Sequence, residues 1–297
     1  MVEINLTTVK LLWLGAVLLW APPLGVFAQP SNPQTTPPES AVAPPAFSAW
    51  LGKYPMSFWT KTRSANTVGK DHISFSLKMQ YFDYDKVMDS SGYYQGLGED
   101  NKAMFSSVLV TKYGWARDHH LALGIPYIWN NSEINNNTFN NNGLGNILIF
   151  EKWNPIKETE YTPAVAFDVW HYFGTGNSTR KVGSDDYAWK FTTEISKAWE
   201  GFSVHLNPGY LIGEGRDCDI VEANAAVLFK PWETFWPGLE YNYMHKETKG
   251  NCQDLIPGFI WKVVPKASIK LGAVINLDSS MKYKDEVSVV LKLFYKF

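Results

Sequence analysis

Apolar and polar residues alternate with a period of two along most of the chain from residue 71 onward. The last segment is the clearest, because Val287, Val289, Leu291, Leu293 and Tyr295 take every second position and alternate with Ser288, Val290, Lys292 and Phe294. Successive side chains of a strand point to opposite faces, so this pattern predicts strands. Twelve are expected, at 72–82, 103–115, 119–129, 144–153, 161–172, 187–198, 202–212, 220–230, 235–245, 255–264, 267–277 and 286–297.

The connections between these segments alternate in length. Those after odd-numbered segments are long, such as 83–102 and 173–186, whereas those after even-numbered segments are as short as 116–118. Bacterial outer-membrane barrels have an even number of strands, short periplasmic turns and longer extracellular loops. We therefore expect an all-β fold, a transmembrane antiparallel up-and-down β-barrel of about twelve strands, with its N-terminus on the periplasmic side.

The first 28 residues have the anatomy of a secretory signal peptide. Lys10 closes a polar start, residues 11–19 form an apolar core, and Val26 and Ala28 offer small residues for cleavage before Gln29. A transmembrane anchor is the less favoured alternative, because the apolar core is short and prolines follow it. Beyond residue 28 no apolar run is long enough for a spanning helix, so a spanning domain must use strands.

Between the signal peptide and the barrel lies a short extension at 29–71. Its first part, 29–46, is rich in proline and predicts an extended tether. Residues 47–60 are apolar again, and helix, plug and extra strand all remain open for them. The expected order is a signal peptide at 1–28, this extension at 29–71 and a barrel at 72–297.

Composition supports an exported membrane protein. The formal net charge is −2, which argues against a nucleic-acid partner, since such proteins usually carry a basic excess. Aromatic residues make up 15% of the chain, which suits the aromatic girdles of a barrel in outer-membrane lipid. The expected location is the bacterial cell outer membrane, and no cofactor is expected because no phosphate loop, haem motif or zinc spacing occurs.

Polar side chains in the mixed rows are candidates for the lumen. They carry both signs, so mutual neutralisation is favoured over charge selection for most of them. Arginines number only four, fewer than a polyanion channel would be expected to use. The candidates are Lys78, Lys190, Glu194, His205, Asn207, Glu240, Asn242, Lys262, Lys270, Glu286 and Lys292.

The two cysteines, Cys218 and Cys252, fall in consecutive loops at the outer end of the expected barrel. Because export exposes them to an oxidising environment, a disulfide between the loops is predicted, with two free thiols as the alternative. An enzyme acting on lipid is the rival functional class. No catalytic or metal-binding residues are assigned, since the histidines, among them His119, His120 and His171, show no recognisable Ser-His arrangement.

The order of several motifs resembles a known family. "LALGIPYIW" at 121–129, "NGLGNILI" at 142–149, "YFGTGN" at 172–177 and "LIPGFIWKVVPKASIKLGAVINL" at 255–277 follow one another before a terminal aromatic. Across 72–297 the chain resembles the outer-membrane family described as transporters of the meta pathway of phenol degradation. The resemblance rests on glycines, prolines and strand patterns, and it implies a barrel and uptake of aromatic compounds.

The functional expectation is therefore a narrow channel for passive diffusion of small molecules, hydrophobic or aromatic ones included. A barrel enzyme acting on lipid and a structural barrel with a filled lumen are the alternatives. The terminal Tyr295 and Phe297, preceded by apolar residues at every second position, resemble the signal that barrel-assembly machinery reads.

Overall fold

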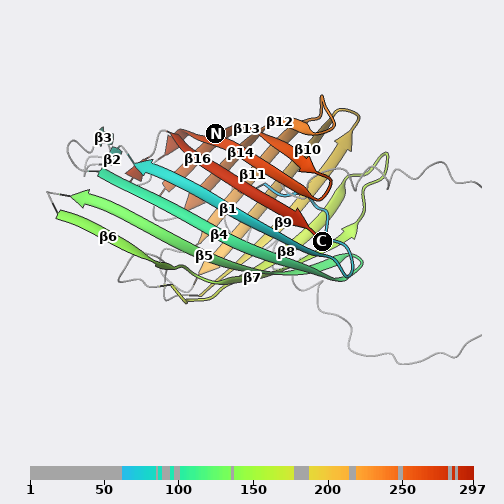
Figure 1. Cartoon of the computed structure of the whole chain (residues 1–297), viewed down its shortest axis with the longest axis horizontal. Coiled ribbons are helices and arrows are strands. Elements are labelled where there is room, and N and C mark those ends of the chain that lie inside the picture. The colour runs from blue at the N-terminus through green and yellow to red at the C-terminus, as the bar shows by residue number, and fades with distance from the viewer. Residues whose placement is uncertain are drawn as a thin grey trace, which may run out of the picture. The chain divides into compact units, whose positions relative to one another are not determined.

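A computed structural model describes residues 62–84, 86–88, 94–96, 101–134, 137–176, 187–213, 219–246, 250–279, 283–284 and 287–297. Twelve antiparallel strands wind around a common axis (Figure 1). They are β1 (Ile73–Tyr84), β4 (Asn101–Ala116), β5 (His119–Ile134), β7 (Leu148–Ile156), β8 (Ala164–Tyr172), β9 (Ala188–Trp199), β10 (Phe202–Gly213), β11 (Ile220–Phe229), β12 (Phe235–Lys246), β13 (Gly250–Val264), β14 (Ala267–Ser279) and β16 (Val287–Lys296).

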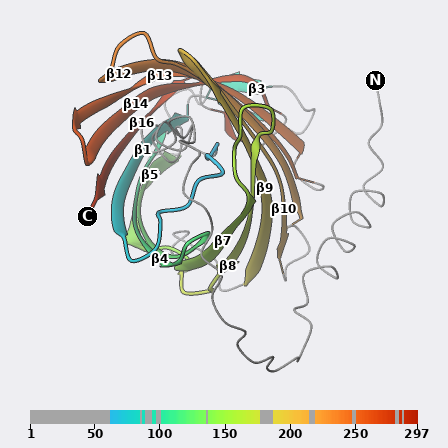
Figure 2. The same cartoon turned by 90° about the vertical axis from the view of Figure 1, so that its right-hand side faces the viewer.

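The strands close into a barrel, seen along its axis in Figure 2. Each strand pairs with its neighbours in chain order, and β1 pairs both with β4 and with the last strand, β16. Closure leaves no strand edge unpaired around the ring, which a barrel in lipid requires. The predicted fold class, an all-β antiparallel barrel of twelve strands, is confirmed.

The expected loops differ from the structure at two places. Strand β5 continues through the Asn-rich stretch to Ile134 and pairs there with β6 (Asn137–Leu144). Strand β13 begins at Gly250, so only residues 247–249 separate it from β12. Local polarity had predicted loops in both places, but cross-strand hydrogen bonding continues beyond the apolar part of each strand. Three short strands, β2 (Lys86–Met88), β3 (Tyr94–Gly96) and β15 (Tyr283–Lys284), form a separate small sheet.

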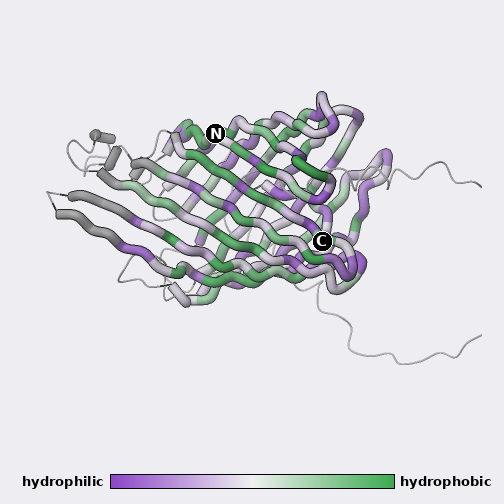
Figure 3. Tube along the Cα trace, viewed as in Figure 1, coloured by the Kyte–Doolittle hydropathy of each residue, from purple (hydrophilic) through white to green (hydrophobic). Residues whose placement is uncertain are grey.

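The outer surface of the barrel is apolar and its interior is largely polar. Leu109, Leu121 and Leu293 are exposed on the outside, whereas Asn207 and Glu240 are buried inside. Apolar stretches run along the strands and polar ones gather at the turns (Figure 3). This arrangement reverses that of a water-soluble protein and matches a barrel whose outer face meets lipid.

The two ends of the barrel differ in the length of the connections between strands. The short-turn end carries turns such as 117–118 and 200–201 and lies on the right in Figure 1. Outward-facing aromatics gather there, and the rings of Trp199 and Phe202 stack with centroids 4.8 Å apart. Such a group suits the aromatic girdle of an outer-membrane barrel.

The structure does not reach the beginning of the chain. The predicted signal peptide at 1–28, the tether at 29–46 and the apolar stretch 47–60 lie outside the described residues. In the part of the chain that is described, no helix is both long and apolar enough to cross a membrane.

Candidate functional site

Residues 62–68, here called the lumen segment, lie inside the barrel (Figure 2). Four of their side chains are buried: Thr62, Ser64, Ala65 and Val68 are each at most 1% exposed. At its C-terminal side the segment continues into a turn at the short-turn end and then into β1. Residues 62–68, just before the first barrel strand, therefore occupy the lumen.

The turn at 69–72 packs flat against β4. The amide of Asp71 donates to the carbonyl of Gly114 at 2.7 Å, and the amide of Gly114 donates to the carbonyl of His72 at 3.0 Å. Gly114 has to be a glycine here, because a Cβ at this position would lie 1.7 Å from the carbonyl oxygen of Gly69. This close approach directs the preceding residues into the barrel.

Side chains of the barrel wall hold the main chain of the lumen segment. Their partners are backbone N–H and C=O groups, which need hydrogen bonds once they are removed from water. Five strands contribute, so the segment is tied to much of the circumference. The bonds are Thr62 N to Glu240 Oε1 (3.1 Å), Arg63 N to Asn207 Oδ1, Asn207 Nδ2 to Arg63 O (3.0 Å), Lys152 Nζ to Ser64 O (2.9 Å), Ala65 N to Ser196 Oγ (2.9 Å) and Val68 N to His120 Nδ1 (3.3 Å).

Arg63 joins the lumen segment to a group of aromatic rings on β7 and β8. Its Nη1 lies 3.3 Å from Oδ2 of the buried Asp168, and its guanidinium carbon lies 3.7 Å from the centroid of the Trp170 ring. Trp170 stacks on Phe150 at 3.9 Å and on Tyr172 at 6.2 Å. The lumen therefore contains an aromatic stack capped by a cation, which combines an ion pair with a cation–π contact.

Carboxylates on the same side of the barrel have cationic partners. Lys152 pairs with Glu194 and lies 3.8 Å from Asp168. Lys190 pairs with Glu222 across β9 and β11. Buried charges are stable when they are paired and hydrogen-bonded. Each of these carboxylates has a cationic partner, but Oδ1 of Asp168 and Oε1 of Glu194 accept no hydrogen bond from the described residues.

His205 lies between two serines inside the barrel. Its Nδ1 is 2.8 Å from Ser196 Oγ, and its Nε2 is 3.1 Å from Ser203 Oγ. A serine hydrolase would need a third polar group to orient the histidine from its far nitrogen, usually a carboxylate or an amide. In this barrel the group at the far nitrogen of His205 is the hydroxyl of Ser203. Ser196 Oγ also accepts a hydrogen bond from the amide of Ala65, so the three residues are arranged to anchor the lumen segment.

The sequence-predicted lumen residues fall into three groups. Those at most 4% exposed are Glu194, His205, Asn207, Glu240, Asn242 and Lys270. Those of intermediate exposure on the strands are Lys78, Lys190, Lys262 and Lys292. Glu286 lies outside the described residues.

Sequence reasoning missed the residues that bind the lumen segment on β5, β7 and β8. His120, Lys152 and Asp168 are each at most 1% exposed and all belong to the site. The alternation of 144–153 does not show which face is inward, and residues 62–68 belong to the 29–71 extension, in which no residue is assigned to the lumen from the sequence. A usable signal was present for Asp168, which shares the parity of Ala164 and Ala166 on its strand.

One of the two cysteines is at a position that differs from the expected one. Cys252 lies within β13 instead of a loop, and its Sγ accepts a hydrogen bond from Asn276 Nδ2 at 3.3 Å. Cys218 lies outside the described residues. The chain crosses the barrel twice, in β11 and in β12, before it reaches Cys252. Strands β11 and β13 therefore begin at the same end of the barrel.

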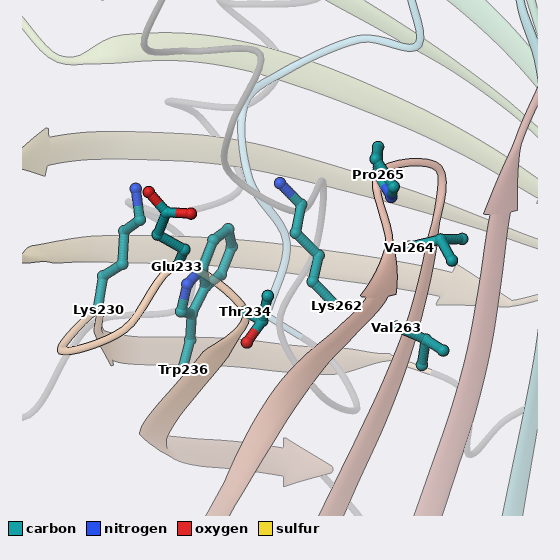
Figure 4. A pocket seen from close by; sticks show the side chains of 8 residues that line it. All are labelled: Lys230, Glu233, Thr234, Trp236, Lys262, Val263, Val264 and Pro265. Carbon is teal, nitrogen blue, oxygen red and sulfur yellow. The ribbon is translucent and has the colours of Figure 1, made fainter.

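A cavity of 310 Å³ lies at the short-turn end, between the turns that follow β11 and β13 (Figure 4). Trp236 is 1% exposed in its wall and donates from Nε1 to the carbonyl of Trp232 at 3.0 Å. The ammonium groups of Lys230 and Lys262 lie 5.7 and 5.4 Å from the centroid of the Trp236 ring. Among the described residues, no group of three or more His, Cys, Asp or Glu could hold a metal ion.

No family model matches the sequence, and no curated protein matches it either. One solved outer-membrane protein shares the fold. An outer membrane channel from Pseudomonas putida F1 aligns with a TM-score of 0.67 at 10% identity, covering 78% of this chain and 98% of that chain. The NanC porin gives 0.49 at 9% identity over 75% and 100% of the two chains, and the CymD monoaromatic hydrocarbon channel 0.46 at 7% over 76% and 88%. At 10% identity, the similarity to the Pseudomonas putida channel concerns the fold alone.

Proposed function

We propose that this chain is an outer-membrane channel through which small molecules, aromatic ones among them, diffuse passively. The observation that carries the proposal is the closed barrel with an apolar outer surface and a polar interior. Such a barrel is stable when its outside meets lipid, and its polar inside then connects the two faces of the membrane. The proposal includes export by residues 1–28, an extension at 29–71 that begins as a tether and ends with the lumen segment, and assembly of 72–297 into outer-membrane lipid.

The aromatic part of the proposal rests on the stack inside the barrel. The rings of Phe150, Trp170 and Tyr172 stack on one another on the lumen side of β7 and β8, and Arg63 caps Trp170. Flat apolar solutes can stack on such rings and exchange rapidly, which suits diffusion better than tight binding. The resemblance of the sequence to transporters of the phenol meta pathway supports the same class of permeant.

The channel would be narrow. Twelve strands enclose far less space than the 16 to 18 strands of a general porin. The lumen segment narrows the channel further. It is held to the barrel wall by hydrogen bonds to wall side chains, such as those from Thr62 N to Glu240 and from Ala65 N to Ser196. These hydrogen bonds can break without breaking any bond between strands, so the segment can move while the barrel stays intact.

A structural barrel with a filled lumen is the second candidate, and the same lumen segment favours it. Main-chain groups from Thr62 to Val68 are bonded to the wall, and the buried side chains leave little water around them. The two candidates differ in one property. A channel passes solute, and a filled barrel does not.

Liposome swelling in arabinose distinguishes them. Vesicles with the wild-type protein are expected to swell faster than protein-free vesicles. Arg63→Ala, which removes the ion pair to Asp168 and the contact with Trp170, is expected to increase the rate. Arg117→Ala, in the exposed turn between β4 and β5, is the control and is expected to match wild type. Absence of swelling in both wild type and Arg63→Ala would support the filled barrel instead.

A further inference from the structure

Lys112 on β4 is a buried cation without a hydrogen bond or ion pair to any residue that the structure describes. It is 9% exposed, and its ammonium group lies 5.6 Å from the centroid of the Phe150 ring. Among the described residues, the charges that act on it are three cations and one carboxylate, that of Asp168. A cation–π contact replaces only part of the hydration that an ammonium group loses on burial, so Lys112 is placed to take an anionic partner.

Two further hydrogen-bond donors beside the Phe150 ring lack an acceptor. Nδ1 of His120 accepts the amide of Val68, so the neutral ring carries its proton on Nε2, and no described residue accepts from that atom. Nε1 of Trp170 is likewise buried without an acceptor in the described part of the chain. The ring centroids of His120 and Trp170 lie 5.8 and 3.9 Å from that of Phe150. We call Lys112, His120 and Trp170 the donor cluster, because each has a donor in excess of its acceptors.

The charges around the donor cluster include one cation more than the carboxylates that face them. Arg63 meets Asp168, and Lys152 meets Glu194. Lys112 is the third cation, and within the described residues no carboxylate pairs with it. The oxygens of Asp168 and Glu194 that accept no hydrogen bond belong to carboxylates that these two pairs already neutralise. One further negative charge would therefore balance the site.

Apolar side chains adjoin the donor cluster on the side of the long loops. The register of β4, β5, β7 and β8 aligns an inner row two residues from Lys112, and three of its members are partly buried and pack against Phe150 and Trp170. Gly124 in this row leaves the space that Leu148 fills, since a Cβ there would lie 2.7 Å from Leu148 Cδ1. We call these three members the apolar row: Val110, Leu148 and Tyr172.

The inner wall from β4 to β8 thus changes character along the barrel axis. Toward the short-turn end, the aligned residues His120, Lys152 and Asp168 are all polar. Toward the long-loop end lies the apolar row. A solute that joins an apolar body to one anionic group matches both halves of this wall, with its anionic group at the donor cluster.

From this geometry we infer that the donor cluster and the apolar row form a binding site for small aromatic carboxylates, held with the carboxylate toward the short-turn end. Ammonium and ring N–H groups donate hydrogen bonds to carboxylate oxygens, and those from the ammonium group are charge-assisted. Aromatic rings border the apolar row, and they favour edge and offset contacts with another ring. The inference rests on the proposed channel function and deepens it, because it names the charge and the orientation of a permeant.

Access to the site depends on the lumen segment. The guanidinium carbon of Arg63 lies 3.7 Å from the centroid of Trp170 and 5.1 Å from that of Phe150, and Val68 is bonded to His120. The segment therefore covers the donor cluster, and its displacement opens the cluster to the lumen.

The first test is calorimetric titration of the detergent-solubilised full chain, which does not depend on conduction. Benzoate is the probe, benzyl alcohol lacks its charge, and acetate lacks its ring. The dissociation constant of benzoate is expected to be at least about tenfold lower than that of either counterpart, because hydrogen bonds to charged groups and burial of a ring are each worth that much. Equal affinity for benzoate and benzyl alcohol, or no binding of benzoate, would overturn the inference.

The second test removes the ammonium group. Lys112→Gln and Lys112→Met are each expected to raise the dissociation constant of benzoate at least about tenfold and to leave benzyl alcohol unaffected. Lys266→Gln, in the exposed turn between β13 and β14, removes the same charge elsewhere and is expected to behave as wild type. Heat-modifiable migration on gels shows which variants are folded. A folded Lys112 variant that binds benzoate as wild type does would contradict the site.

The third test concerns the apolar row. Leu148→Ala is expected to raise the dissociation constant of benzoate about fourfold, the equivalent of one buried methylene group, and to leave that of acetate unchanged. Ile149→Ala, at the next position on β7 and exposed on the outside of the barrel, is the matched control. Equal effects of the two variants on benzoate would remove the apolar row from the site.

These measurements and liposome swelling separate the possible failures. Benzoate binding that depends on Lys112, in a protein that does not increase the swelling rate, would contradict the channel function and support the site. Loss of the preference for benzoate over benzyl alcohol would overturn the site, whatever the swelling rate.

Discussion

Glu158 shows how a single buried carboxylate is tolerated at the edge of the barrel. It lies in the turn between β7 and β8, outside the strands, and its Oε1 accepts the amide of Ala198 at 2.7 Å. Burial raises the pKa of Glu158, while the Ala198 amide and the nearby Lys197 ammonium oppose that shift. The folded protein thus holds a proton on this group more readily than the unfolded chain does.

This raised pKa predicts a pH dependence. Because the folded state binds the proton more tightly, the contribution of Glu158 to stability is greatest below its ordinary pKa and declines as pH rises through the raised value. Glu158→Gln should remove the decline and keep the acceptor for Ala198. Glu158→Ala should cost about 1 kcal/mol at every pH, because it leaves that amide without its partner. Urea unfolding in lipid vesicles at several pH values measures this, and a decline that persists in Glu158→Gln would contradict the assignment.

At the scale of the element, each strand has two rows of side chains, one facing outward and one facing the lumen. The outer rows are mostly apolar, with exceptions such as Glu151 and Thr193, whereas the inner rows mix small, polar, charged and aromatic residues. The lumen segment differs from the strands, because its conformation depends on hydrogen-bond partners from five strands and on the close approach at Gly114. It has little regular hydrogen bonding of its own to specify it in advance.

The facing of β16 gives a direct test of this arrangement. Leu291 follows the outward row, and a lysine near the middle of the bilayer is expected to cost about 2–4 kcal/mol. Leu291→Met, which keeps the volume, is the control. Ser288→Lys, on the inner face of the same strand, should cost less, because that face meets the polar interior of the barrel and not lipid. Unfolding in lipid vesicles compares the three, and equal costs for Leu291→Lys and Ser288→Lys would mean that the facing is wrong.

At the scale of the whole molecule, the barrel is completed by its last residues. The amide of Phe297 donates to the carbonyl of Ile73 at 2.9 Å, and the Phe297 ring lies 5.5 Å from the ring of Phe75. The two terminal aromatics also touch, with the centroids of Tyr295 and Phe297 4.7 Å apart. The seam between the first and last strands therefore depends on the end of the chain.

Deletion of Phe297 is expected to lower the amount of folded protein in the outer membrane. The loss has two causes, removal of the seam contacts to β1 and loss of the aromatic end that we expect barrel-assembly machinery to read. Phe297→Tyr keeps both and is the control. Heat-modifiable protein in outer-membrane fractions measures the effect, and a truncated chain at wild-type levels would sink the proposal for Tyr295 and Phe297.

The cysteines test the overall topology. Two strands separate Cys218 and Cys252, so both positions belong to the same end of the barrel, where adjacent strands are about 4.8 Å apart. We propose a disulfide between them, formed during export and stabilising the protein by about 2–4 kcal/mol. Mass spectrometry of peptides from the non-reduced mature protein should find the linked pair. Two freely alkylated thiols would refute the bond.

The sequence by itself determined the barrel. A period of two, twelve segments and short turns alternating with longer loops are local properties, and the side-chain period of a strand converts them directly into an inner and an outer face. The outward facing of Leu293 and the inward facing of Glu194 follow from this alternation, because the facing of a residue depends only on the sequence of its own strand. Where inner and outer rows had similar polarity, as in 144–153, counting could not find Lys152.

Only the tertiary structure decided what the lumen contains. Lys78 and Lys292 are 214 residues apart in the sequence (292 − 78), and only the closing of β1 onto β16 makes them neighbours. Arg63 has no periodic pattern around it, and its place against Asp168 and Trp170 depends on five strands already being in position. Alternation reports which way a side chain points, but which side chains meet depends on register and closure, and these are properties of the assembled barrel.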